Sequence, residues 1–309
     1  MAHIPYMCPG TDSTTALRDR LDGLLRHAAR ARCVQNLVIG PVTWQWDADL
    51  LQKMIYVWAA VPLLSELTFD VAHNHFYSDL SSGEEFAPVL RGLLYHGTHI
   101  RLHSFTYKHH MTPNSPLERF LAAQPSIQCL FGIHSRWRRC PTITPALLPG
   151  LRAISGDPRL TARLLPSRPL VSINCTAISR RDAEKILDVI EESSPRLVFI
   201  SLKLSTTFAS ERIAQRVVQT APGLRMMDVR DPTIYRECHN VIEKLVMLED
   251  LVCNAPTDNW NRWDPGAFSR WLPPHGPRLK RVVFFTCSGV RVHGGVWERG
   301  EFHNLDGGE

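Results

Sequence analysis

Histidines are the first residues in the sequence whose type and spacing could do chemistry. Half of the fourteen lie between His73 and His110, and the spacing of His96, His99 and His103 suits metal ligands. Because Leu102 opens a segment expected to be a strand, these three residues would straddle a loop and a strand instead of sharing one helical face. We therefore predict solvated or hydrogen-bonded histidines and no metal site.

Signatures of common catalytic sites are absent from the sequence. It contains no Gly-x-x-x-x-Gly-Lys phosphate loop, no Gly-x-Ser-x-Gly nucleophile elbow and no His-Glu-x-x-His helix. We expect a protein that is not an enzyme and that holds no cofactor. An α/β enzyme with an active site built from loops is kept as an alternative, because residues distant in sequence can still form a triad.

The charge of the chain is weakly positive and spread evenly. The net charge is +5, and one run, Arg136-Trp137-Arg138-Arg139, combines cations with an aromatic ring. A solvated loop explains this run without a ligand, so nucleic acid is not an expected partner. The eight cysteines are scattered singly, which favours reduced thiols over zinc ligands and indicates a cytoplasmic or nuclear protein.

Composition indicates a folded chain without a membrane span. Of the 309 residues, 44% are hydrophobic and 21% are charged, which excludes a disordered polar chain. The longest apolar run, Met54 to Leu64, is shorter than the roughly 20 residues that a bilayer requires. Residues 1–10 show no pattern of a secretory signal, so we expect an intracellular protein.

The strongest pattern in the sequence is an internal repeat. Ten short segments have apolar residues at relative positions 1, 4 and 6, with a spacing of 19 to 38 residues between successive copies. The segments are Val34-Leu37-Ile39, Leu64-Leu67-Phe69, Leu102-Phe105-Tyr107, Ile127-Leu130-Gly132, Leu151-Ile154-Gly156, Leu170-Ile173-Cys175, Leu197-Ile200-Leu202, Leu224-Met227-Val229, Leu248-Leu251-Cys253 and Leu279-Val282-Phe284. Proline stands before many of them and could end a preceding helix. Each segment is predicted to be a strand.

Between the strands the apolar period changes to that of an amphipathic helix. Ser179 with Asp182 predicts the N-cap of one such helix, and Ser82 with Glu85 predicts another. The 19-residue spacing around Pro158 and Pro166 predicts only a turn or a 3₁₀ segment. Helices are expected at 15–32, 48–60, a segment carrying Phe86 to Leu94, 116–123, 180–193, 208–219 and 235–247.

Repeats of this size cannot bury a core alone, so neighbours must stack. We predict one α/β domain over 1–309: a right-handed solenoid with a parallel concave sheet and helices on the convex side. Residues 1–33 would form an N-terminal capping helix, and 34–286 would hold about ten irregular repeats. The glycine-rich tail, 287–309, is expected to be loop-like.

The pattern resembles the irregular, longer-repeat members of the leucine-rich-repeat superfamily. Pro195-Arg196-Leu197, Pro222-Gly223-Leu224 and Pro277-Arg278-Leu279 make it similar to the C-terminal repeats of fungal F-box leucine-rich-repeat proteins. The resemblance implies a substrate receptor of an SCF-type ubiquitin ligase with a Skp1-type adaptor as partner. The family's Asn or Cys at position 9 is mostly missing, and no F-box precedes Val34.

Positions 3, 5 and 7 of each strand should point away from the core, onto the concave face. Most of these residues are small or polar, whereas a few are large and apolar beside charged groups, as in protein-binding hot spots. We predict a protein-binding scaffold with this partner-binding set: Phe131, Ile133, Phe199, Lys203, Met226, Asp228, Arg230 and Phe285. Alternatives are that a loop covers these residues as a second small core, or that the chain regulates a small GTPase.

Overall fold

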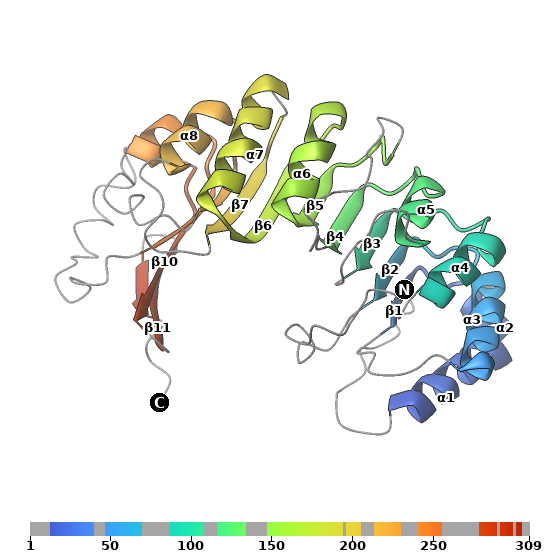
Figure 1. Cartoon of the computed structure of the whole chain (residues 1–309). Coiled ribbons are helices and arrows are strands. Elements are labelled where there is room, and N and C mark those ends of the chain that lie inside the picture. Colours follow the sequence, from blue (N-terminus) through green and yellow to red (C-terminus); the bar gives the residue numbers. More distant parts are fainter. Residues whose placement is uncertain are drawn as a thin grey trace. The chain divides into compact units, whose positions relative to one another are not determined.

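The computed structural model describes residues 13–39, 47–69, 87–107, 116–133, 147–193, 196–204, 213–229, 240–254, 278–288, 291–298 and 301–304. The chain divides into two compact units, Met1–Leu160 and Thr161–Glu309, with the division falling inside helix α6 (Pro158–Leu164). Both units are α/β, and in each the described helices cover one face of an open, mostly parallel sheet (Figure 1).

Unit 1 begins with a pair of helices, after which strands and helices alternate as far as the fourth strand. Its sheet has the order β1-β2-β3-β4-β5, and every neighbouring pair is parallel. The elements are α1 (Ser13–Arg26), α2 (Ala28–Ala31), β1 (Asn36–Ile39), α3 (Ala48–Ala60), β2 (Glu66–Phe69), α4 (Ala87–His96), β3 (Ser104–Tyr107), α5 (Pro116–Ala122), β4 (Cys129–Ile133) and β5 (Ala153–Gly156).

Unit 2 continues the alternation and ends in antiparallel strands. Its sheet has the order β6-β7-β8-β9-β10-β11-β12; the pairs up to β10 are parallel and the last two are antiparallel. The elements after α6 are the 3₁₀ helix η2 (Leu165–Ser167), β6 (Ser172–Ile178), α7 (Arg180–Ser193), β7 (Phe199–Leu204), α8 (Ile213–Thr220), β8 (Met226–Val229), β9 (Asp250–Asn254), β10 (Arg281–Ser288), β11 (Arg291–Glu298) and β12 (Glu301–Asn304). Residues 240–244 are also helical.

The ten predicted segments each contain a strand, so this prediction is confirmed. The middle residues of successive segments are register partners: Leu37, Leu67, Phe105, Leu130 and Ile154 in unit 1, and Ile173, Ile200, Met227, Leu251 and Val282 in unit 2. All are buried, which places the repeated apolar position in one continuous core row within each unit.

A repeated turn leads into most of the strands. The backbone N–H of the first apolar residue donates to the carbonyl three residues earlier, for example Leu64 to Val61 and Leu224 to Ala221. Pro62 and Pro222 occupy the second residue of these turns, where a fixed φ is favourable. Two successive N–H groups then donate to one carbonyl of the preceding repeat, as Ser65 and Glu66 do to Gln35 at 2.8 and 2.9 Å. Proline therefore shapes the turn between helix and strand.

The core lies between the sheet and the helices in each unit. In unit 1 it includes a cluster of aromatic rings, with the centroids of Phe105 and Phe120 4.9 Å apart and those of Phe69 and Phe105 6.1 Å apart. In unit 2, Cys175, the third apolar position of its repeat, is fully buried, and its thiol donates to Thr161 Oγ1 at 3.5 Å. Aromatic residues of this size contribute much of the hydrophobic stabilisation of a core.

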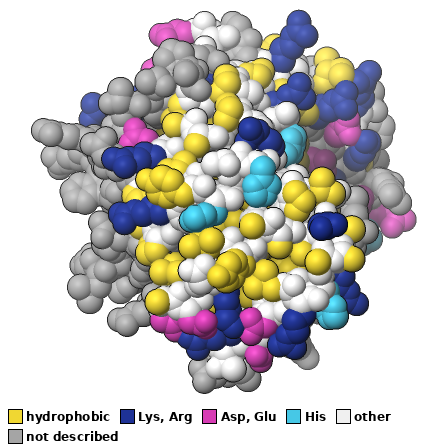
Figure 2. Space-filling view, turned by 90° about the vertical axis from the view of Figure 1, so that its right-hand side faces the viewer, with side chains coloured by type: hydrophobic (Ala, Val, Ile, Leu, Met, Phe, Trp, Pro, Cys, Tyr) yellow, Lys and Arg dark blue, Asp and Glu magenta, His cyan; other side chains and the backbone are white. Residues whose placement is uncertain are grey.

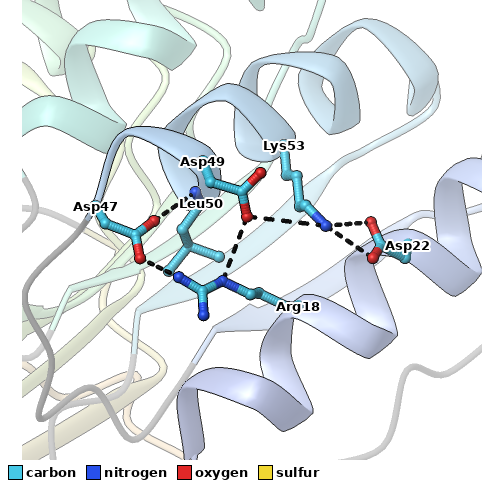
Figure 3. Close-up of polar contacts among 6 residues, drawn as sticks. All are labelled: Arg18, Asp22, Asp47, Asp49, Leu50 and Lys53. Atoms are coloured by element: carbon cyan, nitrogen blue, oxygen red, sulfur yellow. Dashed lines mark hydrogen bonds and ion pairs between the residues drawn. The ribbon is translucent and has the colours of Figure 1, made fainter.

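Helix α1 packs next to α3, buries its Leu17 and Leu21, and is joined to α3 by ion pairs (Figure 3). The Asp47 carboxylate caps α3 by accepting the Leu50 N–H at 2.8 Å, and it also pairs with Arg18. Lys53 Nζ lies 2.7 Å from both carboxylate oxygens of Asp22. The Asp47 side chain thus caps the N-terminus of α3 and also joins α3 to α1.

Most predicted helices are confirmed, with shifted ends. The helix at 48–60 has the predicted bounds, and the 15–32 segment is divided between α1 and α2. The predicted Ser179 cap is present: the Asp182 N–H donates to Ser179 Oγ at 3.2 Å, and Ser179 Oγ–H donates to Asp182 Oδ2 at 2.7 Å. Ser82 and Glu85 lie outside the described residues.

Two secondary-structure predictions are corrected by the structure. The segment near Pro158 forms the helix α6 before the expected 3₁₀ turn, because Pro158 occupies the first helical position and Asp157 Oδ1 accepts the N–H groups of Arg159 and Leu160. The segment 287–309, expected to be loop-like, contains the strands β11 and β12. There Gly294 and Gly295 pair with Phe285 and Phe284, a combination that sheets tolerate.

Candidate protein-binding surface

The strands of unit 2 place two rows of side chains on the face of the sheet that the described helices do not cover. We call this surface the helix-free face of unit 2. The register defines the first row as Ser172, Phe199, Met226, Asp250 and Arg281, and the second as Asn174, Ser201, Asp228, Val252 and Val283. Because side chains alternate along a strand, each row lies opposite the buried core row.

The apolar centre of this face is the pair Phe199 and Met226. The two residues are register partners on β7 and β8, and both are partly exposed. Adjacent strands are separated by about 4.8 Å, so the two side chains form one apolar patch. Val252 and Val283, which are also partly exposed register partners, extend the apolar surface across β9 and β10.

Polar groups adjoin this patch in the second row. Ser201 Oγ–H donates to Asp228 Oδ2 at 3.1 Å, and both side chains are buried, at 1% and 8% exposure. Asn174, the register partner of Ser201, has a buried Oδ1 that accepts no hydrogen bond from the described residues. An amide oxygen without a donor is costly, and a bound partner with an N–H group would satisfy it.

The burial of Asp228 corrects the expectation that it is an exposed contact residue. Its side chain is short and is held laterally by Ser201 on the neighbouring strand, so it lies low on the sheet instead of projecting from it. Asp228 therefore acts within the floor of the helix-free face. The taller Phe199 and Met226 side chains, which are partly exposed, are the ones available for contact.

The face has a charged edge at the beginning of strands β8 to β10. Arg281 Nε lies 2.8 Å from Asp250 Oδ1, and Lys280 and Arg225 both pair with Glu249. The hydrogen bond from Lys280 is the main cause of a Glu249 pKa below its ordinary value, and nearby positive charges add to this effect. Charged groups around an apolar centre are typical of protein interfaces.

Two predicted contact residues lie in unit 1, and only one of them is exposed. Phe131 is partly exposed between Thr106 and Ser155 in the sheet register, and so has no large apolar neighbour across the strands. Ile133 is buried, which corrects its prediction. The register shifts between Phe131 and Ile133, and Gly132 has φ of 77°, so a bulge turns Ile133 into the core.

For the remaining predicted contact residues, the structure describes either the backbone only or no part of the residue. Lys203 and Phe285 belong to strands β7 and β10, but their side chains lie outside the described part of the structure. Arg230 lies outside the described residues altogether, as does the run Arg136 to Arg139.

Reactive and metal-binding side chains do not converge in the described part of the chain. His96 ends α4, while His99 and His103 occupy the connection to β3, and all three are exposed. Within the described ranges, no group of three or more His, Cys, Asp or Glu side chains could hold a metal ion. Burial, with a smaller effect of Glu66, raises the pKa of the Cys129 thiol, which disfavours the reactive thiolate.

Comparison with protein-family models and with curated proteins yields no match for this sequence. Among the helices that the structure describes, none is long and apolar enough to cross a membrane.

Proposed function

We propose that the chain is a leucine-rich-repeat-like scaffold that binds a partner protein through the helix-free face of unit 2. We also propose that the chain forms the predicted single solenoid domain, with a right-handed path and a concave sheet. Its support is the recurrence of one strand, one turn and one pair of bifurcated backbone hydrogen bonds in successive repeats. Repeats that stack in this way commonly present an extended binding surface.

The adjacent, partly exposed Phe199 and Met226 side chains carry the functional proposal. An apolar patch bordered by hydrogen-bonding and charged groups provides both the desolvated centre and the polar surroundings of a protein interface. The acceptor Asn174 Oδ1 favours a partner that presents an N–H group next to an apolar side chain. The described residues offer no comparable support for the enzyme or the GTPase-regulator alternative.

The sequence resemblance adds a more specific hypothesis about the partner. In F-box leucine-rich-repeat proteins the repeats recognise a target for ubiquitination, so the bound protein would be a ligase substrate. A Skp1-type adaptor would then join the complex, although no F-box is visible in the sequence. Addition of purified Skp1 to the isolated chain tests this hypothesis separately from target binding.

A quantitative pull-down with the full chain tests the proposed surface. We expect the double variant Phe199→Ala/Met226→Ala to lose at least about tenfold in affinity for a captured partner, the scale of hot-spot residues. The matched control is Val246→Ala, because this apolar side chain, 59% exposed, belongs to neither row of the helix-free face of unit 2. Equal loss in both variants, with both folded, would refute the assignment of the surface.

A further inference from the structure

A second apolar surface lies in unit 1, in a groove between the neighbouring helices α3 and α4. Its volume is about 220 Å³. Its lining includes Ile55 and Trp58 from α3, and Arg91, Gly92, Tyr95 and His96 from α4. We call this surface the α3–α4 groove. It is separate from the sheet, so the function proposed for the sheet face does not use it.

The size of the groove restricts what can occupy it. Sites for cofactors and drug-sized ligands commonly measure about 300–1,000 Å³. A cavity of about 150 Å³ can hold benzene. The groove, at about 220 Å³, is therefore suited to one bulky side chain of a bound peptide and is small for a whole cofactor.

Gly92 leaves the space open. A Cβ atom at this position would meet Ile55 Cγ1 at 3.6 Å and Trp58 Nε1 at 3.8 Å, which are ordinary contacts. A longer side chain at the same position would extend into the groove. Glycine within a helix costs about 1 kcal/mol relative to alanine, so the open space is kept at the expense of helix stability.

The floor of the groove contains a polar group without a partner. Trp58 is fully buried, and its indole N–H donates no hydrogen bond to any described residue. Buried donors of this kind are normally satisfied, and an acceptor on an occupant of the groove could satisfy this one. The open groove and this unsatisfied indole N–H together indicate a ligand at this place.

The rim of the groove is aromatic and positively charged. Tyr95 is 72% exposed, and Arg91 is exposed as well. No acidic side chain is among the described lining residues. Figure 2 shows this side of the molecule: hydrophobic side chains gather at its centre with a few basic and histidine side chains among them, and acidic side chains lie toward its margins together with further basic ones. Tyr, Trp and Arg are the residue types that dominate hot spots.

We propose that the α3–α4 groove binds an acidic peptide segment of a partner protein and receives one bulky apolar side chain from it. The apolar floor takes the side chain, and Arg91 and His96 face the acidic groups of the segment. This arrangement corresponds to the binding of an amphipathic helix in a groove, with the apolar anchor on one face and charges beside it.

Selection from a random peptide display library on the purified full chain tests the proposal. We expect the enriched peptides to combine a bulky apolar residue with at least two acidic residues. Their affinity, measured by fluorescence anisotropy, should fall at least about tenfold for Gly92→Leu, which fills the groove. Gly23→Leu is the matched control, because a Cβ atom at Gly23 of α1 would have nothing within 4 Å.

A second variant keeps the test decisive if Gly92→Leu does not fold. Arg91→Glu should weaken the same peptides and reduce the salt dependence of binding, whereas Arg30→Glu on α2 should not. The Trp58 indole N–H signal, assigned in NMR spectra with Trp58→Phe, should shift when the peptide binds. Enrichment of basic peptides, or binding that is equal for wild type and the groove variants, would overturn the proposal.

Discussion

Gln124 shows how one buried side chain accommodates an irregular repeat. In the repeat that contains β3, the turn closes at Ile100 but the strand begins only at Ser104, whereas Leu64 is followed by β2 at Glu66. The longer connection leaves a buried carbonyl and a buried N–H without strand partners. The Gln124 side chain donates to the Ile100 carbonyl and accepts the Leu102 N–H, both at 3.2 Å.

Replacing Gln124 with leucine should therefore destabilise the chain. The variant leaves two buried backbone groups unsatisfied, so we expect the free energy of unfolding to fall by about 1–3 kcal/mol per group at most. Urea denaturation followed by circular dichroism measures the change. Gln52→Leu, at an exposed position of α3, should leave the midpoint within experimental error; an equal loss there would contradict the explanation.

Cys129 should react slowly with alkylating agents. Burial is the main cause of its raised pKa, so the thiolate fraction near pH 8 is small compared with that of an ordinary thiol. Peptide mapping after iodoacetamide treatment should show slower modification of Cys129 than of the exposed Cys33. Glu66→Gln removes the secondary, coulombic cause and lowers the pKa, so alkylation should become modestly faster. A slower or unchanged rate would count against this assignment.

At the residue scale, the sequence predicts the face of the sheet to which a side chain points better than it predicts how exposed that side chain is. Strand alternation correctly separates Phe199 and Met226 from the core residues Ile200 and Met227. It fails at Ile133, because the bulge at Gly132 changes the alternation by one residue. It also fails to predict the burial of Asp228, whose carboxylate accepts a hydrogen bond from Ser201 on the neighbouring strand.

At the element scale, the attachment of α1 to α3 should depend on salt. Partly exposed ion pairs contribute about 0.2–1 kcal/mol each and are screened strongly at about 1 M salt. Hydrogen exchange of residues 13–26 should therefore be faster at about 1 M than at about 0.01 M NaCl. The variant Asp22→Asn/Asp47→Asn/Asp49→Asn should exchange quickly at both concentrations, although the asparagine introduced at position 47 can still cap α3. Salt-independent exchange in the wild type would refute an electrostatic attachment.

The pair Glu249 and Lys280 predicts a contribution to stability that depends on pH. Because the pKa of Glu249 is lowered in the folded state, its contribution is present above the ordinary pKa of 4.5 and is lost as pH falls through the lowered value. The difference in denaturation midpoint between the wild type and Glu249→Gln should shrink between about pH 7 and about pH 3. A difference that stays constant over this pH range would contradict the assignment.

Elements are predictable where the apolar period is regular. The strands and the helix at 48–60 follow from it directly. Both corrected secondary-structure predictions concern proline or glycine. Each of these residue types can interrupt a helix or strand or form part of one, and spacing does not distinguish the two cases. Pro158 begins a helix and does not prevent one, and Gly294 pairs with Phe285 inside a hairpin. Both roles depend on neighbours, Asp157 in the first case and β10 in the second.

At the scale of the whole molecule, the repeat predicts sheet neighbours within each unit because successive copies are nearest neighbours. The order of the strands thus follows from the spacing, and the helices between them account for the parallel direction of the pairs up to β10. The α3–α4 groove was not predicted, since it depends on how side chains from two helices meet around Gly92. The sequence signal that could have found it is a glycine within an otherwise apolar helix.

The most direct test of the central claim is site-specific photo-crosslinking on the helix-free face of unit 2. A benzophenone amino acid is placed at Phe199 in one variant and at Lys185, exposed on α7, in the other. Partner protein is then crosslinked and quantified by mass spectrometry. We expect partner-dependent crosslinks from position 199 and none from position 185. Crosslinks from position 185 alone would contradict it.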